Sequence, residues 1–173
     1  MRLDCGICVV RSYRHDDAEA VVKHANNPNV SRYLRDSFPY PYTMADARSW
    51  LSYCVDIDHE ETHFAIEREH EAIGGLGFTR FSGERQFTAE FGYWLGESFW
   101  NQGIMTAAVS AFVDWLWRET DLHRLQSGVF EPNAASRRVL EKCGFTYEST
   151  IRQDVCKNGS FLDTHMFARL RSS

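Results

Sequence analysis

The stretch Phe99-Trp100-Asn101-Gln102-Gly103-Ile104-Met105-Thr106-Ala107-Ala108 decides how this chain folds. It follows a strand-like run that ends at Leu95. Apolar residues then recur every three or four positions from Ile104 to Leu116, which predicts a long amphipathic helix. A loop that opens a helix presents several backbone N–H groups without intrahelical partners, at the positive end of the helix dipole. The stretch is therefore a candidate phosphate site, although taken alone it also fits a plain strand-to-helix connection.

Length and composition limit the class of protein. The 173 residues fit one domain, and we expect a single domain over 1–173. The net charge of -5 argues against nucleic acid as a partner and is compatible with a cationic substrate. No apolar run approaches the ~20 residues of a membrane span, and no signal-peptide pattern opens the sequence. We therefore expect no membrane association and a cytoplasmic location.

The cysteines and histidines do not follow a metal-binding pattern. Cys5 and Cys8 have the CxxC spacing, but a zinc site needs a second ligand pair and a redox site needs a thioredoxin-like setting, and the sequence offers neither. The five cysteines suit reduced core thiols. His59 and His63 are four residues apart, yet His63 begins a predicted strand, so the two do not share a helix face. We expect no metal.

The N-terminal part of the chain predicts a strand followed by helices. Residues 7–10 form a continuous apolar run, and Asp16 is placed to cap a helix that extends to Ala25. Alternating prolines favour an extended loop over residues 38–42. Thr43 with Asp46 has the pattern of a capping box, which predicts a further helix.

Residues 62–95 change to a strand-like period. Three strand-like runs alternate with short polar turns, as is typical of an antiparallel meander, and they cover residues 62–67, 72–79 and 87–95.

The segment after the long helix predicts a second strand-helix unit. Residues 124–129 read as a strand, and Asn133 is a good cap for a helix that ends at Gly144, where glycine readily takes a left-handed conformation. Asn158-Gly159 marks a hairpin turn between two final strands.

The joint order of these features resembles the GNAT N-acetyltransferase superfamily, and within it the ribosomal-protein N-terminal acetyltransferase group of the RimJ/RimL type. The matching stretches are residues 89–95, residues 100–108, Asn133-Ala134-Ala135-Ser136 through Gly144-Phe145, and the Asn158-Gly159 hairpin. The resemblance implies an α+β fold, an α/β/α sandwich. Its mixed central sheet has about seven strands, with a splayed pair at the cofactor cleft.

The resemblance also implies acetyl-CoA as co-substrate. The strand before the loop would bond the pantetheine arm through its backbone, the loop amides would hold the pyrophosphate, and Asn133 would contact the pantetheine. These cofactor-binding residues are Tyr93, Trp94, Leu95, Gln102, Gly103, Ile104, Met105, Thr106 and Asn133. The chain departs from the family at Asn101-Gln102, where many members have glycine and a basic residue, so we expect the loop to bind the phosphates chiefly through backbone N–H groups.

Amine attack on a thioester needs a base for the amine and a donor for the leaving group. Glu90, in an otherwise apolar strand, is the best base candidate, although a solvent-facing or salt-bridged glutamate would look the same. The resemblance places Ser136 near the thioester sulfur, where its hydroxyl would protonate the leaving thiolate. It also places Phe38, Tyr40 and Tyr42 in a loop over the acceptor, where their rings either contact a cation or simply pack.

We therefore expect an acetyl-CoA-dependent N-acetyltransferase that transfers the acetyl group directly, within a ternary complex, to a primary amine. The acceptor is either a protein N-terminus or a small amine of the polyamine or aminoglycoside type. A non-catalytic acyl-CoA-binding module with the same fold is the alternative. The family resemblance is compatible with a monomer or a homodimer.

Overall fold

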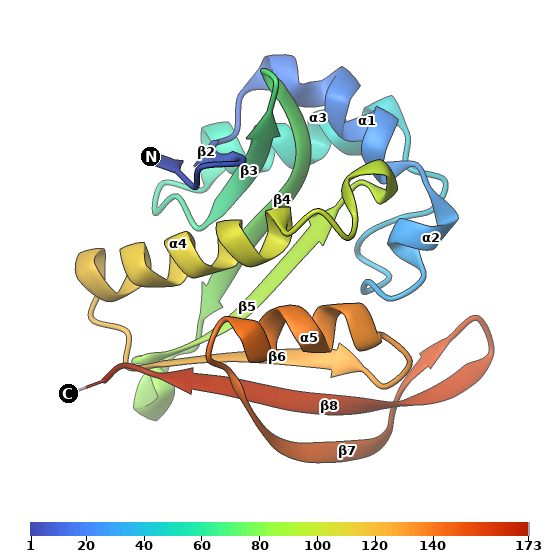
Figure 1. Ribbon diagram of the computed structural model, residues 1–173. Helices are drawn as coiled ribbons and strands as arrows, with labels where there is room; N and C mark the ends of the chain where they lie inside the picture. The colour runs from blue at the N-terminus through green and yellow to red at the C-terminus, as the bar shows by residue number, and fades with distance from the viewer. Residues whose placement is uncertain (173) are drawn as a thin grey trace. The chain divides into compact units, whose positions relative to one another are not determined.

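The computed structural model describes residues 1–172, and these residues form eight strands, one more than expected. They group into two compact units. Unit 1 comprises Met1–Phe78 and Gly92–Phe112, and unit 2 comprises Thr79–Phe91 and Val113–Ser173. Figure 1 shows the elements of both units, coloured along the chain.

The strands of unit 1 follow one another in the sheet in sequence order. Each pair of neighbours from β1 to β4 is antiparallel, and the C-terminal half of β5 lies next to β4. Because Gly74 and Gly75 have no Cβ, the backbone of β4 can approach Trp94 of β5 closely. The strands are β1 (Arg2–Asp4), β2 (Val9–Ser12), β3 (His63–Arg68), β4 (Glu71–Arg80) and β5 (Thr88–Leu95).

Helices cover both faces of this sheet within unit 1 (Figure 1). On one face, α1 and α3 bury a cluster that includes Ala65 of β3 and Ala72 of β4. On the other face, Phe64 packs against Phe112 of α4, with ring centroids 5.3 Å apart. Successive residues of β3 thus point to opposite faces of the sheet and pack into two different cores, as expected for a strand. The helices are α1 (Ala18–Ala25), α2 (Pro28–Ser31), α3 (Met44–Ser52) and α4 (Ile104–Glu119), with the π-helical turn Tyr53–Ile57 after α3.

Two expectations for the N-terminal region are wrong. The strand expected at residues 7–10 begins only at Val9, because Gly6, with φ of 80°, turns the chain between β1 and β2. The apolar run continues across this turn, which hid the boundary. Asp16 does not cap the first helix. The chain enters α1 through the 3-10 turn His15–Asp17, and the Asp17 carboxylate accepts the N–H of Arg14 at 2.9 Å.

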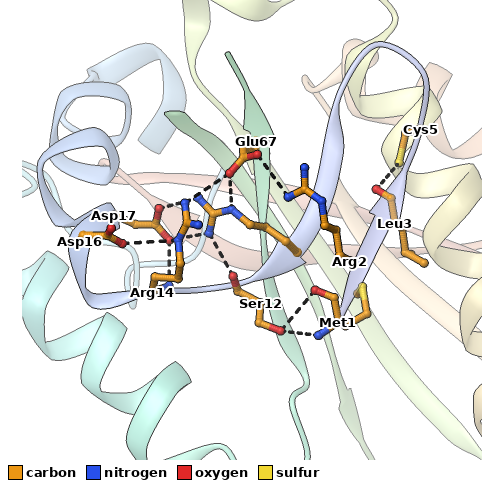
Figure 2. Close-up of polar contacts among 10 residues, drawn as sticks. Met1, Arg2, Leu3, Cys5, Ser12, Arg14, Asp16, Asp17 and Glu67 are labelled. Atoms are coloured by element: carbon orange, nitrogen blue, oxygen red, sulfur yellow. Dashed lines mark hydrogen bonds and ion pairs between the residues drawn. The ribbon is translucent and has the colours of Figure 1, made fainter. Parts of the chain in front are cut away.

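A buried ion cluster fixes this entry into α1. The Arg11 side chain is 5% exposed, donates to both Asp17 oxygens at 2.6 and 2.8 Å, and donates from Nε to Glu67 at 2.5 Å. Figure 2 shows Arg2 and Arg14 reaching the same glutamate from either side. Although burial alone would raise the pKa of Glu67, its hydrogen bond to Arg11 and the charge of Arg11 hold it below its usual value. Removing one member of such a cluster typically costs about 3–5 kcal/mol.

The local signals elsewhere in unit 1 are confirmed. Thr43 and Asp46 form the expected capping box of α3: the Asp46 carboxylate accepts the Thr43 N–H at 2.7 Å. His63 begins β3, as expected. In the part of the chain that is described, no helix has the length and apolar character that crossing a bilayer requires.

Unit 2 contains the remaining strand pairs. The N-terminal half of β5 pairs in parallel with β6, over three residue pairs from Thr88↔Arg124 to Glu90↔Gln126. β6 then pairs antiparallel with β8, and β8 with β7. Asn158 and Gly159, with φ of 51° and 77°, make the hairpin turn between β7 and β8 as expected. The elements are β6 (Arg124–Phe130), α5 (Ala134–Lys142), β7 (Thr146–Lys157) and β8 (Ser160–Leu170).

The end of α5 is a Schellman motif, which confirms the helix end expected at Gly144. Gly144 has φ of 78°, its N–H donates to Glu141, and the N–H of Phe145 donates to Leu140 at 3.0 Å. The Phe145 ring then stacks on Phe91 of β5, with centroids 6.1 Å apart. The motif therefore both ends the helix and delivers an aromatic ring to the core of unit 2.

Candidate functional site

The loop before α4 is the centre of the candidate site. After the 3-10 turn Glu97–Phe99, Asn101 and Gly103 take left-handed conformations, with φ of 60° and 78°. The Gly103 carbonyl accepts the N–H of Ala107 at 3.0 Å, the first bond of α4, so Gly103 is the cap position of this helix. Residues 101–103 are exposed, whereas Ile104 and Met105 are buried. An exposed turn thus leads directly into a helix start that is packed in the core.

The side chain of Gln102 ties the loop to β3. Its Oε1 accepts from Arg68 Nη1 at 2.7 Å, and its Nε2 donates to the Ser98 carbonyl at 2.9 Å. Arg68, at the end of β3, thus places a positive charge beside the loop. Sequence reasoning missed this residue because Arg68 is 34 positions away from Gln102 and no local pattern links the two.

The end of β5 is joined to the same loop. The indole Nε1 of Trp100 donates to the Leu95 carbonyl at 2.8 Å. Trp100 is 39% exposed, so it connects the loop to the end of β5 at the surface and is not part of the buried core. Tyr93 and Trp94 are half-buried, and Leu95 is buried. Unit 1 thus brings the three expected pantetheine-strand residues and the five expected pyrophosphate-loop residues into one connected segment.

The three aromatic residues of the 38–42 loop have different environments. Phe38 packs on Trp94 with ring centroids 5.5 Å apart, and also on Tyr42 at 5.0 Å. Tyr42 is buried in the core, and burial raises its pKa to about 12. Tyr40 is 54% exposed, so of the three it alone presents most of its ring to solvent.

Glu90 lies in the parallel pair of unit 2, opposite Gln126. Its neighbour Phe91 is 2% exposed and points into the core, whereas Glu90 is half-buried on the other face of β5. Gln126 itself accepts a hydrogen bond from Arg85 Nη2 at 3.1 Å. Glu90 thus occupies the last position of the parallel register.

Asn133 and Ser136 open α5 in unit 2. The Asn133 Oδ1 accepts the N–H of Ser136 at 3.2 Å, so the asparagine caps the helix. Both side chains are half-buried. The capping bond uses the carbonyl oxygen of the amide and leaves its Nδ2 donor pointing away from that bond.

His63, which sequence spacing pairs with His59, makes its contacts with side chains of unit 1. The Nδ1 of His63 lies 2.9 Å from the Thr62 hydroxyl and 3.3 Å from Asp58, and its ring packs edge-on against Trp50. Among residues 1–172, no group of three or more His, Cys, Asp or Glu side chains is arranged to hold a metal ion.

Comparisons with known proteins identify the fold and the family. The acetyltransferase (GNAT) domain family matches residues 8–146. A protein of Bacillus licheniformis called uncharacterized N-acetyltransferase p20 is 27% identical over 94% of this chain and 92% of its own length. The ribosomal-protein-serine acetyltransferase of Escherichia coli is 33% identical over 64% of this chain and 61% of its own length.

Among solved structures, the RimL ribosomal L7/L12 alpha-N-protein acetyltransferase in complex with coenzyme A is similar with a TM-score of 0.88. It is 24% identical, and the match covers 98% of each chain, so the likeness shows a shared fold. The expected GNAT fold is thereby confirmed. This chain belongs to the GNAT acetyltransferase family and is an acetyl-CoA-dependent N-acetyltransferase.

Proposed function

We propose that residues 1–173 act as one catalytic domain that acetylates the N-terminal amine of a protein, with the pyrophosphate of acetyl-CoA held at the start of α4. The observation that carries this proposal is the exposed loop of residues 101–103, in which Gly103 caps α4. The N–H groups of the first helical turn have no partner further back in the helix, and the helix dipole favours an anion at this end. As the family resemblance implies, we assign the phosphates to the main-chain N–H groups of Gln102, Gly103, Ile104, Met105 and Thr106.

Arg68 supplies the charge that the loop itself lacks. Its guanidinium is held beside the loop by Gln102 and is 35% exposed. A cation in this position attracts the diphosphate from solvent, and the attraction weakens as salt increases. Arg68 of β3 thus takes the role that a basic residue inside the loop has in many relatives.

The remaining contacts orient the thioester. Backbone groups of Tyr93 and Trp94, together with the Leu95 N–H, bond the pantetheine amides, since the Leu95 carbonyl is already used by Trp100. In unit 2, the resemblance assigns Asn133 to the pantetheine, and its Nδ2 is the donor for this contact because its Oδ1 is used in the cap.

Glu90 and Ser136 each carry out one proton transfer, Glu90 as the base and Ser136 as the acid. Glu90 accepts the proton that the acceptor ammonium must lose before it can attack the carbonyl carbon, directly or through a water molecule. Ser136 donates a proton to the sulfur as the carbon–sulfur bond breaks. The acetyl group passes directly to nitrogen, so one amide bond forms as one thioester bond is lost.

A protein N-terminus is the acceptor that we favour over a small amine. The 33% identity to a ribosomal-protein-serine acetyltransferase supports this choice. The exposed ring of Tyr40 and the packed ring of Phe38 offer apolar contact to the residues that follow an N-terminal amine. Polyamines and aminoglycosides lack such residues and instead carry several cations.

The test measures thiol release from acetyl-CoA with peptides of different N-termini, polyamines and aminoglycosides as acceptors. Peptide acceptors should be turned over fastest. Glu90→Gln should lower kcat about 100-fold or more and leave CoA affinity unchanged, because it removes a base without touching the loop. Glu119→Gln, at an exposed site, serves as the matched control.

Three outcomes would count against the proposal. Unchanged turnover in Glu90→Gln would remove Glu90 from the mechanism. Tight CoA binding without turnover of any amine would favour a non-catalytic acyl-CoA-binding module. Absence of thermal stabilisation by CoA would contradict binding itself, since a ligand that binds only the folded state raises its apparent stability.

A further inference from the structure

The N-terminal hairpin places two cysteines opposite each other. β1 and β2 pair as Arg2↔Arg11, Leu3↔Val10 and Asp4↔Val9, so the next opposing positions are Cys5 and Cys8. The Cys5 N–H donates to the Cys8 carbonyl at 2.9 Å, which shows that the pairing continues to this position. Opposing residues of an antiparallel pair point to the same face, so both thiols lie on the face of the hairpin that also carries Val10.

This geometry suits a disulfide. Opposing residues in an antiparallel pair have Cα atoms about 4.5–5.5 Å apart, and disulfides span Cα separations of about 4.4–6.8 Å. The turn between the cysteines is Gly6-Ile7, in which Gly6 takes φ of 80°. A bond between the two sulfur atoms therefore needs no large movement of the backbone.

The two thiols differ in the way that thiol–disulfide exchange requires. Cys8 is 4% exposed, whereas Cys5 is only partly buried and its Sγ lies 3.7 Å from the Leu3 carbonyl (Figure 2). The neighbouring Cys8 thiol lowers the pKa of Cys5, whereas the Cys5 thiol and burial raise the pKa of Cys8. Cys5 is thus the accessible nucleophile, and Cys8 the buried partner that completes the exchange.

The turn between the cysteines touches the start of α4. The Sγ of Cys8 lies 3.9 Å from the Ile104 carbonyl. The Ile7 side chain reaches to within 3.9 Å of the position that a Cβ on Gly103 would occupy. Ile7 is 48% exposed, so it lies beside the loop at the protein surface. A change in the conformation of the hairpin turn therefore alters contacts at the start of α4.

We propose that Cys5 and Cys8 are a reversible dithiol–disulfide site that controls the affinity of the α4 loop for CoA. A low-molecular-weight disulfide such as oxidised glutathione is the oxidant. The Cys5 thiolate attacks one of its sulfur atoms and releases one glutathione thiolate; Cys8 then attacks the Cys5 sulfur and releases the second. The two protein thiols are oxidised, the glutathione disulfide is reduced, and the two thiol protons pass to the released thiolates.

The first experiment tests the modification alone. It is carried out on Cys156→Ser protein, because Cys156 is exposed on β7 and would react independently. Glutathione buffers of increasing oxidised fraction should yield protein lighter by two hydrogens. Cys8→Ser in this background should stop at a mixed disulfide between Cys5 and glutathione, whereas Cys5→Ser should not react at the hairpin. Failure of the internal disulfide to form under strongly oxidising buffers would overturn the proposal.

The second experiment tests the control of CoA affinity, and this part rests on the proposed pyrophosphate role of the loop. Closing the disulfide removes the Cys8 S–H that faces the Ile104 carbonyl and constrains the turn that holds Ile7 beside Gly103, so oxidised protein should bind CoA about fivefold more weakly or worse. By linkage, saturating CoA must shift the dithiol–disulfide equilibrium towards the dithiol by the same factor. Cys5→Ser should bind CoA with the affinity of reduced protein in any buffer.

The outcomes separate the two proposals. Equal CoA affinity of the reduced and oxidised protein would overturn the control of the loop, even if the disulfide forms. If reduced protein does not bind CoA at all, the function proposed for the loop fails, while the mass measurement still decides whether the cysteines form a disulfide.

Discussion

The two helices that carry the expected site residues begin in different ways. At the start of α5, a side chain closes the helix: Asn133 Oδ1 accepts the Ser136 N–H at 3.2 Å. At the start of α4, the cap position is Gly103, which contributes only its carbonyl, to Ala107. A glycine has no side chain with which to satisfy the N–H groups of the first turn.

The difference indicates which part of each helix start is available for chemistry. The first turn of α5 is partly satisfied by the Asn133 Oδ1, so the Asn133 Nδ2 is the side-chain donor that the capping bond leaves for a ligand. The first turn of α4 offers its main chain. The main chain at the start of α4 suits an anion, which needs no single direction of approach. The side chains at the start of α5 suit a thioester, which must be oriented and protonated.

The start of α4 should be the most sensitive position for CoA binding. Gly103→Val should weaken CoA binding by at least about tenfold, because a β-branched residue in a left-handed conformation costs about 1–2 kcal/mol or forces the loop to change. Isothermal titration with CoA gives the affinity, and thermal unfolding gives the stability.

Gly144 provides the matched control for this variant. It has the same φ of 78°, and at both positions a Cβ would meet its nearest neighbour at an ordinary contact distance, 3.6 Å for Gly144 and 3.9 Å for Gly103. Gly144→Val should therefore lose similar stability and keep its CoA affinity. Equal losses of affinity in both variants, or none in Gly103→Val, would contradict main-chain binding at α4.

A smaller effect is expected from the charge beside the loop. Arg68→Gln should weaken CoA binding about threefold to fivefold at low salt, and the difference from wild type should fade as salt is raised. Arg80 is an appropriate control, since its side chain is 32% exposed against 35% for Arg68 and pairs with Asp121 instead. A salt-independent loss in Arg68→Gln would show that the arginine shapes the loop through Gln102 rather than attracting the phosphates.

Sequence reasoning succeeded where a structure is determined by neighbours along the chain. The capping box of Thr43 and Asp46, the left-handed Gly144 and the Asn158-Gly159 turn each depend on residues within a few positions, and all are confirmed. Sequence also identified the loop before α4, because the change from a strand period to a helical period marks the helix start.

Contacts between residues that lie far apart in the sequence were not predicted. The pairing of Arg11 with Glu67 spans 56 positions and that of Arg68 with Gln102 spans 34, and neither has a local pattern. The error at Asp16 has the same origin: the carboxylate that matters is that of Asp17, which is recruited by Arg11 from the preceding strand. Ile7 was taken for a strand residue because hydrophobicity alone does not show that an apolar side chain at a turn packs on another loop.

At the start of α5, one side chain should have two roles, and each should have a modest effect. Asn133→Ala removes both the capping oxygen and the Nδ2 donor, so it should lower the free energy of unfolding by about 1 kcal/mol and weaken CoA binding about threefold. Asn133→Ser keeps a good capping oxygen without the amide donor. It should therefore retain nearly full stability and show the same loss of CoA affinity. Chemical denaturation and CoA titration on both variants separate the roles. If Asn133→Ser also keeps full CoA affinity, the asparagine is only a cap, and Ser136 is then the side chain through which the start of α5 can act on acetyl-CoA.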